Sequence, residues 1–149
     1  MKPIHVSPGG GKAVNVLGTS MLLRVLGSDT NGTLAVVESI DAPHAGPPPH
    51  IHAREDETFQ VLAGEYEFMV AGKTISARAG DTLFAPRGIP HTYNCVSPGG
   101  GKLSVTLTPA GFENFFAEIG AMSPQEQQNI PLVIETAKRY GLEFLPPPA

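Results

Sequence analysis

Two histidines stand one residue apart in the stretch GPPPHIHAREDETFQVLAG, and a run of three acidic residues follows them. On an extended strand, residues i and i+2 point to the same face, so His50 and His52 can present their imidazoles to one metal ion. The acidic run consists of Glu55, Asp56 and Glu57. If the chain reverses direction within this run, one of these carboxylates reaches the same ion, which predicts a site of mixed nitrogen and oxygen ligands.

Glu57 is the preferred carboxylate because of the strand that it opens. It begins the stretch ETFQVL, in which Phe59 and Val61 follow at a spacing of two. If Glu57 points inward, these two apolar side chains also point inward, which is the pattern of a half-buried strand. We expect Glu55 and Asp56 to be loop carboxylates in solvent.

A second segment, GDTLFAPRGIPHTYN, adds His91 after a turn that is rich in Gly and Pro. The first histidine pair alone is also compatible with solvated surface residues, but a third histidine that opens another strand favours a shared site. Tyr93 and Cys95 would follow His91 on the inward face. Two residues advance a strand by ~6.6 Å, so we expect Cys95 to be a buried thiol beyond the ligands. Arg87, in the turn, contacts either an anionic substrate or solvent.

The elements that must position these residues are short strands. The chain has 149 residues, with 17 Gly and 15 Pro, and 41% of its residues are hydrophobic. Stretches rich in Val, Leu and Ile recur between turn residues, and in EYEFMV the glutamates alternate with Tyr66, Phe68 and Val70. Many short strands at this spacing are typical of a sandwich or barrel. We predict an all-β sandwich or barrel over about residues 14–108, in a single domain of residues 1–149.

The C-terminal part of the chain has a helical pattern, and we predict a helical extension over about residues 111–141. In GFENFFAEIG, three phenylalanines and an isoleucine recur at helical spacing, which indicates core packing. Ser123 and Glu126 are placed as in a capping box. The stretch PLVIETAKRYG predicts a further helix that ends at Gly141, and the closing LPPPA predicts an extended tail.

The first histidine segment resembles the first motif of the cupin superfamily. Four residues stand at the spacing of that motif, namely His50, His52, Glu57 and Gly64. One position departs from it, because three residues separate Gly46 from His50, whereas in the motif five residues separate the glycine from the histidine.

The second histidine segment resembles the second cupin motif, after a spacer of fifteen residues that is usual for small cupins. The residues that match at full spacing are Gly80, Pro86, Gly88 and His91. The last position departs, since Cys95 stands where the motif has asparagine.

The resemblance implies a double-stranded β-helix, which is a small jelly-roll barrel, with one metal ion inside. The family's ligands correspond to His50, His52, Glu57 and His91 in this sequence. Three imidazoles and one carboxylate suit a divalent transition metal, namely Fe, Mn, Ni, Co or Zn. They do not suit calcium or magnesium, which prefer oxygen ligands.

Within the cupins, the sequence looks similar to small quercetin 2,3-dioxygenase-like proteins. This resemblance implies oxidative cleavage of a flavonol or a similar enol, with Glu57 as both ligand and catalytic proton acceptor. We expect Phe59, Phe68, Phe84 and Tyr93 to form the substrate-binding pocket. Two alternatives stay open: a redox-neutral isomerase or lyase that acts on a small hydroxy- or keto-acid, and a cupin that binds metal or ligand without turnover.

Charge and composition limit the partners of the protein. The net charge is −4 and no block of Lys and Arg is present, which argues against nucleic acid. No apolar run has the ~18 residues that a membrane span needs. A single cysteine fits a reducing compartment, so we expect a cytoplasmic protein. We further expect a small-molecule substrate, anionic or aromatic, and, by analogy with other small cupins, a homodimer.

Overall fold

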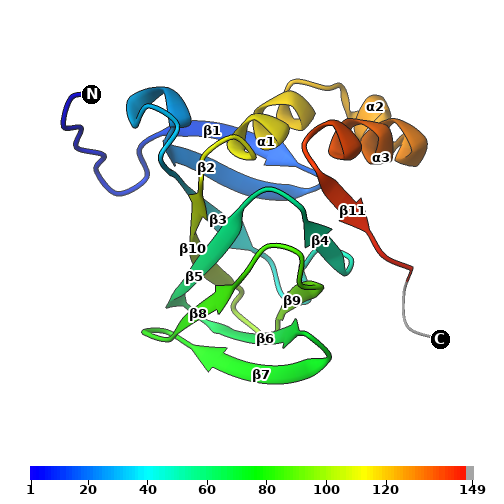
Figure 1. Cartoon of the computed structure of the whole chain (residues 1–149). Coiled ribbons are helices and arrows are strands. Elements are labelled where there is room, and N and C mark those ends of the chain that lie inside the picture. The colour runs from blue at the N-terminus through cyan, green and yellow to red at the C-terminus, as the bar shows by residue number, and fades with distance from the viewer. Residues whose placement is uncertain (147–149) are drawn as a thin grey trace.

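The structure is a computed structural model that describes residues 1–146, and its strands form two antiparallel sheets around a common interior (Figure 1). The first sheet has six strands, in the spatial order β1 (Lys12–Val16), β2 (Thr19–Val25), β3 (Ala35–Asp41), β10 (Gly101–Thr108), β5 (Asp56–Ala63) and β8 (Thr82–Ala85). The second has five, in the order β11 (Leu142–Phe144), β4 (His50–His52), β9 (His91–Cys95), β6 (Glu65–Val70) and β7 (Lys73–Arg78). The predicted double-stranded β-helix is confirmed.

The alternation of apolar residues sets which face of each strand is buried. In β5, Phe59 and Val61 are buried, whereas Gln60 between them is exposed. In β6, Tyr66 and Phe68 are buried and their glutamate neighbours are exposed. Successive side chains of a strand point to opposite faces, so these apolar residues can fill only the interior of the barrel.

Strand β10 is central to the first sheet, and it aligns the layers of the interior. Val105 lies opposite Val37 of β3 on one side and Phe59 of β5 on the other. Leu107 lies opposite Glu57 in β5, which places this carboxylate in register with a buried leucine. The register of β10 therefore sets the height at which Glu57 enters the barrel.

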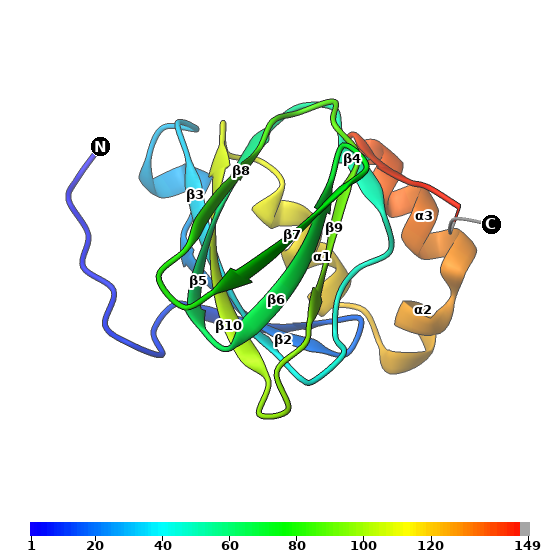
Figure 2. The same ribbon diagram turned by 90° about the horizontal axis from the view of Figure 1, so that it is seen from below.

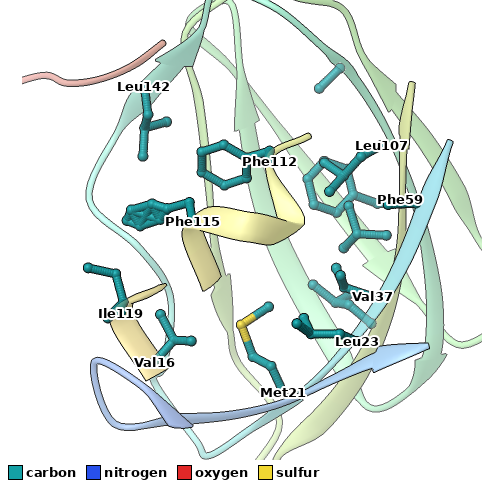
Figure 3. Packing of buried hydrophobic residues seen from close by; sticks show 14 of the residues in the cluster. Val16, Met21, Leu23, Val37, Phe59, Leu107, Phe112, Phe115, Ile119 and Leu142 are labelled. Carbon is teal, nitrogen blue, oxygen red and sulfur yellow. The ribbon is translucent and has the colours of Figure 1, made fainter. Parts of the chain in front are cut away.

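The helical extension covers one side of the barrel, where apolar side chains of both parts meet in one core (Figure 3). It contains α1 (Glu113–Gly120), α2 (Pro124–Gln128) and α3 (Ile130–Arg139), as predicted. The Ser123 side chain accepts a hydrogen bond from the Glu126 amide at 3.2 Å, and the Glu126 carboxylate accepts one from the Ser123 amide at 3.0 Å. This capping box confirms the predicted start of α2. In Figure 2, α2 and α3 lie on the side of the barrel opposite the N-terminal arm.

Strand β11 is an element that we did not predict, and it lies between the helix predicted to end at Gly141 and the predicted tail LPPPA. It pairs with β4, so that Leu142 lies opposite His52 and Phe144 lies opposite His50. Its partner is about 90 residues away in sequence, and a three-residue strand has too few residues for a visible alternation. The last three residues of the predicted tail lie outside the described residues. No helix in the described part of the chain is long and apolar enough to cross a membrane.

The proline-rich segment before β4 lies against β9. The His44 amide donates to the Cys95 carbonyl, and the Cys95 amide donates to the Ala45 carbonyl, both at 2.8 Å. At Gly46 the two backbones approach so closely that an added Cβ would lie 1.8 Å from the Tyr93 carbonyl oxygen. Only glycine fits at this position without movement of the backbone.

We therefore expect Gly46→Ala to lower the free energy of unfolding by about 1–3 kcal/mol, the usual cost of inserting an extra group into a packed site. Chemical denaturation of the purified variant measures this change. Gly99→Ala is the matched control, because an added Cβ at Gly99 meets no atom within 4 Å. Equal stability of the two variants would contradict this account of the segment.

Candidate metal centre

Four buried side chains from three strands meet inside the barrel. His50 and His52 lie on the same face of β4, as their spacing predicts, and His50 is paired with His91 in β9. Glu57 comes from β5, in phase with the buried Phe59. All four residues, His50, His52, Glu57 and His91, are less than a tenth exposed.

The four side chains are close enough to bind one ion. One ligand atom from each lies within 4.8 Å of all the others. Glu57 Oε2 is 2.6 Å from His91 Nε2 and 3.2 Å from His52 Nε2, and the ring centres of His50 and His91 are 4.4 Å apart. With ligand bonds of about 2.1 Å, neighbouring donor atoms around an ion lie about 3 Å apart and opposite ones about 4 Å apart. The group fits a single ion.

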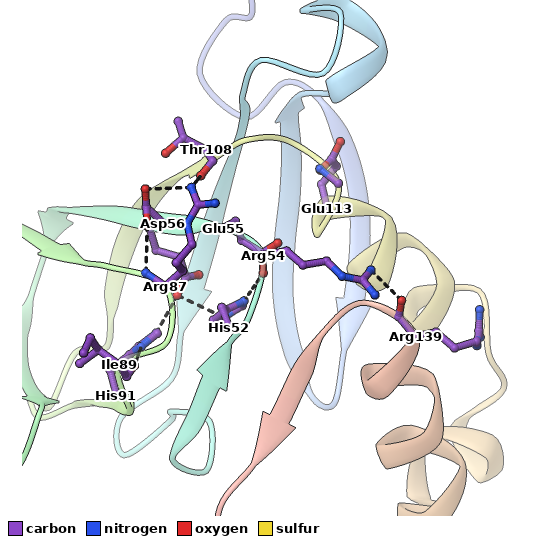
Figure 4. Close-up of polar contacts among 12 residues, drawn as sticks. His52, Arg54, Glu55, Asp56, Arg87, Ile89, His91, Thr108, Glu113 and Arg139 are labelled. Carbon is purple, nitrogen blue, oxygen red and sulfur yellow. Dashed lines mark hydrogen bonds and ion pairs between the residues drawn. The ribbon is translucent and has the colours of Figure 1, made fainter.

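Each imidazole has its Nδ1 atom next to an oxygen outside this group. His50 Nδ1 is 2.9 Å from the Pro48 carbonyl, His52 Nδ1 is 2.6 Å from Glu55 Oε1, and His91 Nδ1 is 3.3 Å from the Ile89 carbonyl. Carbonyl oxygens and ionised carboxylates only accept hydrogen bonds, so each Nδ1 atom is placed to donate a proton to its partner. The Nε2 atoms then have free lone pairs, which is the tautomer that a metal ligand needs. Figure 4 shows the contacts of His52 and His91.

The charges in the group favour metal binding. Burial and the neighbouring His91 lower the pKa of His50 to about 4, so this imidazole is neutral near neutral pH. Burial alone would raise the pKa of Glu57, but interactions with His52 and His91 outweigh burial and lower it. The group therefore offers one carboxylate and three imidazoles, which is a donor set for Fe, Mn, Co, Ni or Zn.

The two other residues of the acidic run differ from expectation. We expected Glu55 in solvent, but it is only 3% exposed and it contacts His52, because the turn after β4 folds back over the ring. Asp56 is partly exposed, and its carboxylate accepts two hydrogen bonds from the Arg87 guanidinium at 3.1 Å each. The pKa of Asp56 is lowered by these hydrogen bonds. Arg87 is thus part of an ion pair that joins the turn after β8 to the start of β5 (Figure 4).

We call His50, His52, Glu57 and His91 together the metal-ligand group. A cavity of about 260 Å³ opens onto this group. Phe59 and Tyr93, two of the expected substrate-binding residues, line it. Phe68 lies behind them, fully buried, with its ring centre 5.2 Å from that of Phe59, and it is not among the residues that line this cavity.

The expectation that Phe84 lines the pocket was wrong. This side chain is 56% exposed, and it pairs with the outward-facing Thr58. The neighbouring Ala85 lies opposite Glu57 and takes the inward position. The sequence of β8, which has only four residues, did not show which of them face inward. Its pairing with β5 decides this.

Most of the cavity wall comes from residues that we did not predict to line it. Phe112, Phe115 and Phe116 of the helical extension and Phe144 of β11 contribute on one side. The ring of Phe112 stands edge-on to that of His52, with ring centres 4.5 Å apart. The helical spacing of these phenylalanines did indicate burial, but the spacing could not show that the buried face would reach the metal-ligand group.

A buried group of three histidines and one carboxylate inside a double-stranded β-helix defines a class of metal-binding jelly-roll domains. Residues 37–107 match the family described as "Cupin domain". The predicted resemblance to cupins is confirmed.

The chain is also similar to individual proteins. It is 41% identical over 59 residues to an "Uncharacterized protein" of Aquifex aeolicus (strain VF5), a match that spans 40% of this chain and only 46% of that relative. Among solved structures, KdgF from Halomonas sp. is 18% identical with a TM-score of 0.65, covering 76% of this chain and 99% of that one. An RmlC-like cupin from Shewanella frigidimarina is 25% identical with a TM-score of 0.64, covering 75% and 96%. These similarities support the fold.

The ligand assignment predicts that His50→Ala, His52→Ala and His91→Ala each weaken metal binding by at least about 100-fold, since loss of a residue that only orients a ligand typically costs 10–100-fold. Elemental analysis of the purified variants, with circular dichroism to verify the β fold, measures the effect. His44→Ala is the control, because His44 is exposed and outside the group. Undiminished metal in the three variants would refute the assignment.

The three acidic residues should contribute unequally to the metal affinity, in the order Glu57, Glu55, Asp56. Glu57→Gln removes the ligand charge and should weaken binding most. Glu55→Gln keeps an oxygen beside His52 but loses its charge, so a loss of about tenfold is expected. Asp56→Asn should leave the metal affinity unchanged, because that residue contacts Arg87 instead. Chelator competition measures all three affinities, and a larger loss for Asp56→Asn than for Glu57→Gln would overturn the order.

Proposed function

We propose that this protein is a metal-dependent enzyme whose substrate is a small, largely apolar molecule with one acidic enol or phenol hydroxyl. Oxidative cleavage of that molecule by dioxygen is the reaction that we favour. The observation that carries this proposal is the composition of the cavity wall around the metal-ligand group. Among the described residues that line the cavity, none is a lysine or arginine, and most are aliphatic or aromatic.

The cavity wall favours one class of substrate over others. Hydroxyl groups are contributed only by Thr19, Ser39 and Tyr93 among the described lining residues. A sugar or polyhydroxy acid would leave many of its polar groups without partners there, and a buried polar group without a hydrogen bond costs ~1–3 kcal/mol. An aromatic enol has an apolar body that matches the wall and a single oxygen to place at the metal-ligand group.

The metal-ligand group suits an anionic oxygen. A divalent ion held by His50, His52, His91 and the single carboxylate Glu57 would supply a centre of net positive charge that stabilises an enolate as a Lewis acid. Glu57 is the only carboxylate among the described lining residues, so its carboxylate oxygens are the base that takes the hydroxyl proton. Phe112 covers His52 with its ring and keeps water from that side of the group.

The size of the cavity limits the substrate further. Pockets for drug-sized ligands usually enclose about 300–1,000 Å³, and this cavity encloses about 260 Å³. A substrate of one or two rings fits this volume better than the three rings of a flavonol. Quercetin is thus a probe at the upper limit of size, and one-ring enols are the probes of choice.

The test is an absorbance assay with the protein loaded in turn with Fe²⁺, Mn²⁺, Co²⁺ or Ni²⁺, with and without dioxygen. We expect loss of a one-ring enol such as allomaltol, or of quercetin, only with metal and dioxygen, and none with His50→Ala protein. No dioxygen-dependent loss with any metal would refute the dioxygenase reaction. Conversion without dioxygen would instead support the redox-neutral isomerase or lyase.

A further inference from the structure

A buried polar network lies in the barrel away from the metal-ligand group. Asp41 Oδ2 accepts hydrogen bonds from the Ser39 hydroxyl at 2.9 Å and from the Tyr66 hydroxyl at 2.5 Å. Ser39, Asp41 and Tyr66 are each less than 5% exposed. None of them belongs to the group that could hold a metal ion.

One member of this network faces the cavity. Ser39 lines it together with Tyr93, whereas Asp41 and Tyr66 lie behind the wall. Ser39 is in register with Leu103 of β10, which is in turn in register with Val61 of β5. Val61 lies four residues beyond Glu57, which is ~13 Å along the strand. The cavity therefore has polar side chains at two sites, one at the metal-ligand group and one at Ser39, and apolar residues lie between these sites.

Tyr93 lines the cavity together with Ser39, and the ring of Phe59 connects it to His91. The ring centre of Tyr93 is 5.9 Å from that of Phe59, and the ring centre of Phe59 is 5.9 Å from that of His91. A one-ring molecule held at the metal-ligand group thus has the Tyr93 side chain within reach of its far end.

Ser39 and Tyr93 have complementary hydrogen-bonding capacities. The Ser39 hydroxyl proton is directed to Asp41, so the oxygen of Ser39 has lone pairs left to accept a hydrogen bond. Donation to a carboxylate also makes that oxygen a better acceptor, because hydrogen bonds in a chain polarise one another. Tyr93, as a phenol, has a hydroxyl proton to donate.

We propose that Tyr93 and Ser39 together bind a hydroxyl group at the end of the substrate that points away from the metal-ligand group. Tyr93 donates to the substrate hydroxyl, and Ser39 accepts from it. Asp41 and Tyr66 are positioning residues that fix the orientation of the Ser39 hydroxyl. This inference rests on the proposed function, and it narrows the substrate to an enol that carries a second hydroxyl across its ring.

The experiment compares two pyranone enols that differ by one hydroxyl. Kojic acid carries a hydroxymethyl group across the ring from its enol, and allomaltol carries a methyl group there. Calorimetric titration of Co²⁺-loaded and metal-free protein gives both dissociation constants. We expect the loaded protein to prefer kojic acid by about two- to tenfold, the effect of one net hydrogen bond.

The variants test the assignment of that preference. Tyr93→Phe and Ser39→Ala should bring the ratio of the two dissociation constants close to one, and Asp41→Asn should reduce the ratio partly. Thr19→Val is the matched control, because it removes a different cavity hydroxyl and should preserve the ratio. A general loss of stability would weaken both ligands alike and would not change the ratio.

The outcomes separate this inference from the proposed function. Two results would overturn only the proposed contact of Tyr93 and Ser39 with the substrate hydroxyl, which is the second contact of the substrate. They are metal-dependent binding of both pyranones with equal affinity, and a preference that survives both Tyr93→Phe and Ser39→Ala. If neither pyranone binds either form of the protein, enolate recognition at the metal-ligand group fails, and the second contact fails with it.

Discussion

The burial of one negative charge, the carboxylate of Glu57, is the constraint on which the rest of the structure depends. A buried ion costs several kcal/mol unless partners compensate for it. Here the partners are three imidazoles, two of which contact Glu57 Oε2 directly. Each imidazole is oriented by an oxygen next to its Nδ1 atom, so the strands must deliver both the ligands and the groups that orient them.

This demand explains why the C-terminal extension returns to the barrel. Strand β4 carries two of the ligands but has only three residues, and it joins β9 through a single residue pair. The extension supplies β11, which pairs with all three residues of β4. The same extension places Phe112 against His52. The segment that supports the ligand strand therefore also forms the cavity wall.

The result is a division of roles between parts of the chain. The part that matches the cupin family, residues 37–107, contains the four residues that could hold a metal ion, whereas the β1–β2 hairpin, α1 and β11 supply much of the apolar wall. Since the wall decides which molecules fit, the selectivity of this cavity depends on segments outside residues 37–107. This arrangement is one physical reason why a single fold accommodates many functions.

Local spacing in the sequence predicted a sandwich or barrel from the period of two in the strands, a helical extension near the C-terminus, and a histidine pair from the one-residue gap between His50 and His52. The double-stranded β-helix and the complete ligand set came from the resemblance to cupins. The sequence did not predict the exposure of Phe84, the burial of Glu55 or the pairing of β11. These features depend on which strands become neighbours and in what register, so they arise from contacts between residues distant in the sequence. The tertiary structure alone decided the cavity, because a void is bounded by all of these segments at once and no single stretch encodes it.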